Sequence, residues 1–186
     1  MYFLQPNQKK FLESVNPILV TVFFYLLMVG RTNIEYVFPD VFRHWDILLP
    51  FIVYFGQRRS IAEGLTLSIL TAHLYSLSSI APIGVFVLHY LSLFIIARVL
   101  SYVIYANEGF TILMLLFALS LLARIINLPI ASLFGHSWGS NGIGAFGMGL
   151  FLNTVLGFFI YLSLSLLDRM TFKTPTINIE MAGDSL

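Results

Sequence analysis

Four histidines are the residues of this chain best suited to bind a metal ion. They are His44, His73, His89 and His136, and no two have the i, i+4 spacing of the H-E-x-x-H zinc motif. The chain has no cysteine, which removes thiolate ligands, disulfides and a thiol nucleophile. We therefore interpret them as isolated histidines that are hydrogen-bonded inside a helical bundle, and we predict no metal site.

Recognisable enzyme motifs give no better starting point. The serines include no G-x-S-x-G nucleophile elbow, and Asp46 and Glu63 are expected near opposite membrane faces, too far apart for an aspartic protease pair. Residues 142–147 (GIGAFG) match the G-x-G-x-x-G dinucleotide pattern. That fingerprint requires a preceding strand, whereas an apolar helix precedes it here. The sequence predicts a non-enzymatic protein without a cofactor.

Composition places the chain in a membrane. Of its 186 residues 58% are apolar and 10% charged, with a mean hydropathy of +0.88. Soluble domains have about 45–50% apolar and about 25% charged residues. Charges this sparse cannot cover a globule in water, which excludes a soluble enzyme and a module that binds nucleic acid. We expect an integral membrane protein.

Apolar stretches divide the chain into candidate membrane spans, each of which needs about 20 residues. They run over 12–30, 46–56, 61–80, 82–105, 110–134 and 145–167. The second is short, with an amphipathic lead-in from Pro39. The runs are continuously apolar, which favours helices over a β-barrel. The sequence predicts one all-α domain over 1–173, a bundle of six transmembrane helices, and a flexible cytoplasmic tail over 174–186.

Basic residues predict the orientation. One side of the predicted bundle carries Lys9, Lys10, Arg58, Arg59, Arg98, Arg169 and Lys173, whereas the other carries Arg31 and Arg43. The positive-inside rule then makes both termini cytoplasmic. We expect five of these residues to meet anionic lipid headgroups: Lys9, Lys10, Arg58, Arg59 and Arg169.

Small residues recur every four positions in two of the predicted helices. The first set is Gly64, Ser68, Ala72 and Ser76, and the second is Ala145, Gly149, Asn153 and Gly157. Residues four apart share a helix face, and small side chains let helix backbones approach closely in lipid. These stripes predict two closely packed helices.

Polar side chains inside the spans are the candidates for contact with a partner or a ligand. They are Arg124, Asn127, Asn153, His73 and His89, all expected in the middle or outer half of the membrane. Arg124 stands out, because a buried charge is costly and only Asp46 could supply a carboxylate at its depth. The alternative is that Arg124 extends toward the outer interface or pairs with backbone carbonyl groups.

Residues 40–170 resemble the bacterial rod shape-determining protein family MreD. The resemblance begins with a short apolar helix, a basic turn and a glycine-bearing helix (WDILLPFIVYFGQRRSIAEGLTLSIL). It continues with a P-x-G turn in SLSSIAPIGVFVLHYLSLFIIARVLSYVIY and a closing span, NTVLGFFIYLSLSLLDRM. One departure is that the family often has an Asp several residues before the Pro, where this chain reads HLYSLSS.

The resemblance implies a scaffold subunit of the cell-elongation machinery in the bacterial cytoplasmic membrane. Its expected partner is the single-span protein MreC and, through it, the class B penicillin-binding transpeptidase, the glycosyltransferase RodA and the MreB filament, in support of peptidoglycan synthesis. The family is also similar in fold to the S components of energy-coupling-factor transporters. That similarity implies the alternative function, a small-molecule (vitamin) binding subunit.

Overall fold

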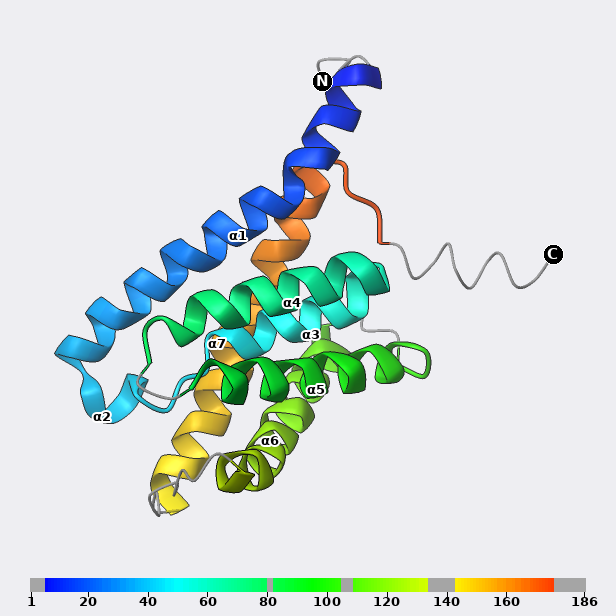
Figure 1. Cartoon of the computed structure of the whole chain (residues 1–186). Coiled ribbons are helices and arrows are strands. Elements are labelled where there is room, and N and C mark those ends of the chain that lie inside the picture. Colours follow the sequence, from blue (N-terminus) through cyan, green and yellow to red (C-terminus); the bar gives the residue numbers. More distant parts are fainter. Residues whose placement is uncertain (1–5, 80–81, 105–108, 134–142, 176–186) are drawn as a thin grey trace.

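The computed structural model describes residues 6–79, 82–104, 109–133 and 143–175, apart from the side chains of 128, 131, 132, 143 and 145. Every regular element in these residues is a helix. The helices are α1 (Pro6–Val37), α2 (Pro39–Phe42), α3 (Leu48–Arg58), α4 (Ile61–Ser76), α5 (Ile83–Ser101), α6 (Gly109–Leu133) and α7 (Ile143–Met170) (Figure 1).

Four stretches of helix are long and apolar enough to cross a membrane: Pro6–Val37, Ile83–Ser101, Gly109–Asn127 and Phe146–Met170. This confirms the predicted class, a helical membrane protein. A helix overlaps each of the six predicted spans, but α3 has only 11 residues and α4 only 16. The count of six spans and the orientation stay predictions, and the predicted tail lies largely outside the described residues.

The first helix is much longer than its apolar run, which was predicted to cover 12–30. α1 extends from Pro6 to Val37. Beyond Gly30 it is continued by an ion pair between Arg31 and Glu35, 3.0 Å apart and one helical turn from each other. Polar residues that pair in this way support a helix as well as apolar ones do. The end of the apolar run therefore did not mark the end of the helix.

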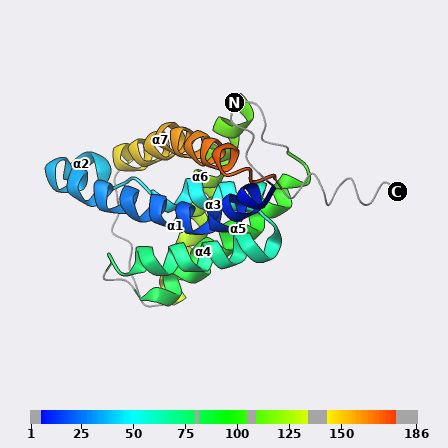
Figure 2. The ribbon, with the colours of Figure 1, turned by 90° about the horizontal axis from the view of Figure 1, so that it is seen from above.

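The short helix α3 forms the centre of the bundle, with α1, α4, α5, α6 and α7 around it (Figure 2). Every residue from Leu48 to Gln57 is buried. A helix of this length measures about 16 Å, well short of the roughly 30 Å hydrocarbon layer. Because its residues are buried from the first turn to the last, the polar groups at both ends must be satisfied within the protein.

Glycines in α3 and α4 allow this close packing. A Cβ at Gly56 would lie 2.7 Å from the Ala97 Cβ and 3.1 Å from the α5 backbone. A Cβ at Gly64 would lie 2.7 Å from the ring of Phe94 and 3.2 Å from the Phe55 carbonyl oxygen. α3, α4 and α5 consequently pack side by side as one layer, and α6 and α7 run together across it (Figure 1).

Candidate functional site

A network centred on Asp46 satisfies the N-terminal end of α3. The Asp46 Oδ1 accepts hydrogen bonds from the backbone N–H of Leu48 at 3.1 Å and of Leu49 at 3.3 Å. An aspartate just before a helix is suited to this task, because the first N–H groups of a helix lack intrahelical acceptors. The same oxygen also accepts from the hydroxyl of Tyr90, on α5, at 2.9 Å.

Asn153 extends the Asp46 network to α6 and α7. Its Oδ1 accepts from the backbone N–H of Asp46 at 2.8 Å, and its Nδ2 donates to the Ser120 hydroxyl at 3.0 Å. Both side chains are buried, Asn153 at 4% exposure and Ser120 at 0%. Four helices thus meet in one chain of hydrogen bonds, and Asn153 connects the two that cross the α3–α5 layer.

Arg124 lies one helical turn beyond Ser120 on α6 and is partly buried. Its guanidinium lies over the Phe146 ring, 4.8 Å from the centroid, and packs directly on Gly149 of α7. A Cβ at Gly149 would collide with this guanidinium and would lie 2.9 Å from the His44 carbonyl oxygen. We call Arg124, Phe146, Gly149 and the His44 carbonyl the Arg124 seat.

Arg124 forms no ion pair within the described part of the chain, and Asp46 is the carboxylate that acts on its charge from a longer distance. No described carboxylate lies within 4.0 Å of it, whereas Arg31, Arg59 and Lys173 each have such a partner. Its buried Nε also has no hydrogen-bond partner among the described residues. The seat therefore holds a guanidinium with unused donors at the edge of the bundle.

The other predicted polar residues are not gathered at one point. His89 is buried beside Tyr90, with ring centroids 4.9 Å apart, and Asn127 is partly buried three residues beyond Arg124. His73 is exposed on α4. Asn153, His89 and Arg124 thus surround the segment 44–46, whereas His73 stands apart.

The two small-residue stripes differ in what they contact. Gly64, Ser68, Ala72 and Ser76 are all buried on α4, and Gly64 packs on α5 and α3. On α7, Gly149 holds Arg124, Asn153 joins the Asp46 network, and a Cβ at Gly157 would lie 3.4 Å from Pro50. The side chain of Ala145 is outside the described residues.

A second network, which the sequence analysis missed, surrounds Arg59 at the other end of α3. The Arg59 Nη2 donates to Asp168 Oδ1 at 2.6 Å and to Asn16 Oδ1 at 2.7 Å. The hydroxyl of Tyr54 donates to the second Asp168 oxygen at 2.5 Å. The Asn16 amide donates to Asp168 at 2.9 Å and to the Thr171 hydroxyl at 2.6 Å.

Two further contacts complete the Arg59 network. Glu63 of α4 forms an ion pair with Lys173 at 3.0 Å and lies 3.7 Å from the Arg59 Nε. Arg98 of α5 donates to the Arg59 carbonyl oxygen at 2.7 Å. Through these contacts the network joins α1, α3, α4, α5 and α7.

The structure corrects the expectation that Arg59 meets lipid headgroups, because its side chain is fully buried and paired. A signal was available in the sequence. Asp168 ends the last apolar run on the same predicted side as Arg58 and Arg59, and a charge there needs a partner.

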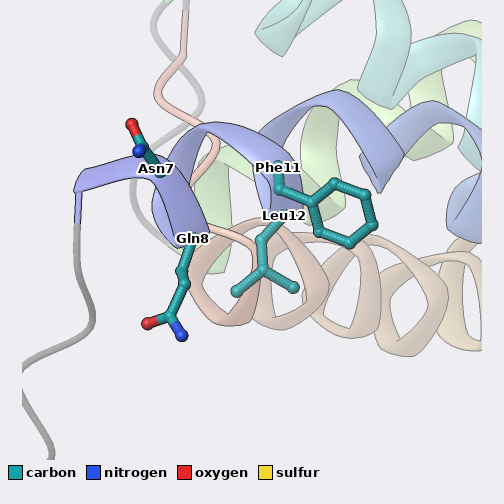
Figure 3. Close-up of a pocket in the computed structure, with 4 residues that line it drawn as sticks. All are labelled: Asn7, Gln8, Phe11 and Leu12. Carbon is teal, nitrogen blue, oxygen red and sulfur yellow. The ribbon is translucent and has the colours of Figure 1, made fainter.

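Two hollows in the described part of the chain lie away from the polar candidates. One, of about 410 Å³, is lined by Asn7, Gln8, Phe11 and Leu12 of α1 (Figure 3). The other, of about 470 Å³, lies between α5 and α6 and is lined by apolar residues and Thr111. Neither contains Arg124, Asn153 or His89.

Comparison of the chain with known protein families, with curated proteins and with solved structures finds no match. The fold itself defines a helical membrane protein with a buried central helix and a polar network at each end of it.

Proposed function

We propose that this chain is a non-enzymatic, MreD-like scaffold subunit of a bacterial cell-elongation complex, with both termini cytoplasmic. In this proposal its partner is a single-span protein of the MreC type, which connects it to the transpeptidase, RodA and MreB. The segments that carry the resemblance include the central helix: they are α3 with its basic turn, the first part of α4, all of α5 and the second half of α7.

The Arg124 seat is the observation that carries the proposal. A guanidinium at the edge of a bundle, with unused donors and no described carboxylate within 4.0 Å, is an incomplete polar contact. In lipid such a group is stabilised by pairing with a polar or acidic side chain of a neighbouring helix. The transmembrane helix of a partner, lying along α6 and α7, would supply that group.

Affinity purification from detergent tests the proposal directly. The tagged chain is expressed in cells that also produce its natural membrane partners. The proteins that co-purify with it are identified by mass spectrometry. We expect a single-span, coiled-coil protein, with at least fivefold less recovered from Arg124→Leu. Arg43→Leu is the matched control, because Arg43 is an exposed arginine just after α2. Equal recovery from both variants would contradict the proposal.

A specific observation favours the second candidate, a small-molecule binding subunit. Three buried polar atoms near the Asp46 segment have no hydrogen-bond partner within the described residues: Trp45 Nε1, His89 Nδ1 and Arg124 Nε. Unpartnered buried polar atoms point to a bound water or ligand. If this candidate is correct, a stoichiometric anionic small molecule co-purifies with the wild type and is lost from a stably folded Arg124→Leu variant.

A further inference from the structure

An exposed row of large apolar side chains runs along α6 and ends at Arg124. It consists of Phe110, Met114, Phe117 and Leu121, whose exposure falls from 68% at the first to 38% at the last. Arg124 comes three residues after Leu121 and is partly exposed. Residues spaced alternately by four and by three lie on one face of a helix. We call these five residues the α6 stripe.

The α6 stripe begins at the hollow between α5 and α6. This hollow, of about 470 Å³, is lined by the first three residues of the stripe together with Leu100, Ile104, Thr111, Leu115 and Ala118. From Phe110 to Arg124 the helix rises by about 21 Å. An apolar depression therefore lies at one end of the stripe and a guanidinium at the other.

The direction of the stripe connects the hollow with the guanidinium. Residues seven apart on an α-helix are displaced around its axis by about 20°. Phe110, Phe117 and Arg124 are seven apart, so the stripe moves from the α5 side of α6 toward the α7 side, where the guanidinium packs on Gly149. A second helix that crosses α6 at about 20° follows such a path, as helices do in left-handed coiled coils.

The guanidinium of Arg124 is held in place but has no close counter-charge in the described part of the chain. The Phe146 ring and Gly149 fix its position. Asp46 acts on it from a longer distance, and one Asp46 oxygen already accepts from two backbone N–H groups and from the Tyr90 hydroxyl. A fixed guanidinium suits a carboxylate, which can accept two parallel hydrogen bonds from it.

We infer that the α6 stripe is the docking surface for a partner's transmembrane helix that carries a carboxylate two heptads from its contact with the hollow. This inference rests on the proposed function and gives the chemistry of its partner. Apolar side chains of that helix enter the hollow and pack along Met114, Phe117 and Leu121. An Asp or Glu of the same helix then lies opposite Arg124.

Two other occupants fit the α6 stripe less well. A second copy of this chain has the same orientation in the membrane, so symmetric contact between two α6 helices would bring one Arg124 against the other. An acyl chain would fill the hollow, but it brings no carboxylate to the guanidinium. The regular spacing of large side chains suits the interlocking side chains of a second helix, whereas an acyl chain requires no such spacing.

Photo-crosslinking in native membranes tests this docking surface. A photoreactive phenylalanine analogue replaces Phe117 or Leu121 in the tagged chain, and the cross-linked peptides are sequenced by mass spectrometry. We expect both positions to capture one membrane-spanning helix, at residues three or four apart, with an Asp or Glu another three or four residues along it. The matched control is Phe151, which is 61% exposed on α7 and lies outside the stripe. This position should not capture that helix.

Charge exchange tests the carboxylate. With Arg124→Glu, capture from position 121 should fall about tenfold, because polar contacts between helices in lipid change affinity by roughly that factor. Replacing the carboxylate of the captured helix by arginine should restore it. Arg124→Gln should lower capture in the same direction, which keeps the test available if a thermal melt shows that Arg124→Glu unfolds. Arg43→Glu changes an exposed arginine outside the stripe and should capture as the wild type does.

Three results would overturn the inference. They are a captured helix without a carboxylate level with Arg124, a charge exchange that does not restore capture, and capture of phospholipid or of a second copy of this chain from both positions. In each case co-purification can still recover a partner that depends on Arg124, so the proposed function stands. Equal recovery of the partner from Arg124→Leu and Arg43→Leu would instead remove the proposed function and this inference together.

Discussion

The guanidinium of Arg59 and the carboxylate of Asp168 lie 2.6 Å apart, although 109 residues separate them in the chain. Arg59 follows the central helix and Asp168 belongs to the last one, so their pairing fixes the end of α7 against α3. Asn16 bonds to both side chains and brings α1 to the same point. Among the four membrane-length helices α1 is the least buried, and Asn16 thus attaches it to the bundle through the buried Arg59–Asp168 pair.

We predict that Asp168→Asn strongly destabilises the protein. Removing one partner of a buried pair leaves the other charge without compensation, which costs about 3–5 kcal/mol. For a chain of this size the melting temperature should fall by about 10 °C, measured as loss of the monomer peak after heating in detergent. The matched control is Asp40→Asn, because Asp40 is exposed on α2.

A double-mutant cycle distinguishes pairing from simple loss of packing. Arg59→Met combined with Asp168→Asn should cost less than the sum of the two single changes, by about 0.5–3 kcal/mol. Strict additivity, or an Asp168→Asn protein as stable as Asp40→Asn, would show that the pair does not hold the helices together.

The hydrophobic pattern of the sequence predicted the class of fold, because that class depends on whether the chain folds in water or in lipid. Long apolar runs with few charges are not stable when exposed to water. In the structure they form the long helices α1, α5, α6 and α7. The pattern could not give the ends of α1. Those depend on side-chain pairs such as Arg31 with Glu35, whose contribution of a few tenths of a kcal/mol leaves no hydrophobic signature.

Site residues were harder to predict than helices because they depend on long-range contacts. Arg124 and Asn153 stood out as polar residues in apolar runs, but their partners Gly149, Ser120 and the Asp46 backbone come from other helices. Arg59 followed a short helix in a basic turn, which predicts exposure. Only the fold shows that the turn points inward, toward Asp168.

The glycines of α7 should differ in their tolerance of substitution. Gly149→Leu places a side chain where the Arg124 guanidinium and the His44 carbonyl lie, and Gly157→Leu places one against Pro50 and Leu116. Overpacking of this kind costs about 1–3 kcal/mol. Gly147→Leu is the control, because nothing lies within 4 Å of its Cβ position. Thermal melts should show lowered stability for the first two alone.

Gly149→Leu should also reduce recovery of the partner as much as Arg124→Leu does, because it displaces the guanidinium from its seat. If Gly149→Leu melts like Gly147→Leu, the close contact between α6 and α7 at this position does not exist.

Orientation can be tested by single cysteines, since the chain has none of its own. Lys10 and Asp40 are both exposed and lie near opposite ends of α1. With both termini cytoplasmic, an impermeant maleimide applied to intact cells should label Asp40→Cys and not Lys10→Cys. Both variants should react after the cells are permeabilised. The reverse pattern in intact cells would invert the proposed topology.

Asn153 lies in Phe146–Met170, one of the stretches that are long and apolar enough to cross a membrane. Along α3, residues 46 and 59 are about 20 Å apart, so the Asp46 and Arg59 networks cannot both lie at the edges of a hydrocarbon layer of about 30 Å. If the Arg59 network lies at the cytoplasmic edge, as the proposed orientation requires, the Asp46 network lies within that layer, where no water compensates a lost bond.

Asn153→Ala should therefore lower the stability of the protein more than the few atoms it removes would suggest. It leaves the Asp46 N–H and the Ser120 hydroxyl without their partner, at about 1–3 kcal/mol for each unsatisfied group. Tyr90→Phe should cost less, about 1 kcal/mol, because the Asp46 carboxylate keeps the backbone N–H groups of Leu48 and Leu49. Asn33→Ala changes an exposed asparagine of α1 and should cost nothing measurable. Melting temperatures in one detergent should follow this order, and an Asn153→Ala protein as stable as Asn33→Ala would mean that the Asp46 network does not join α6 and α7 to the α3–α5 layer.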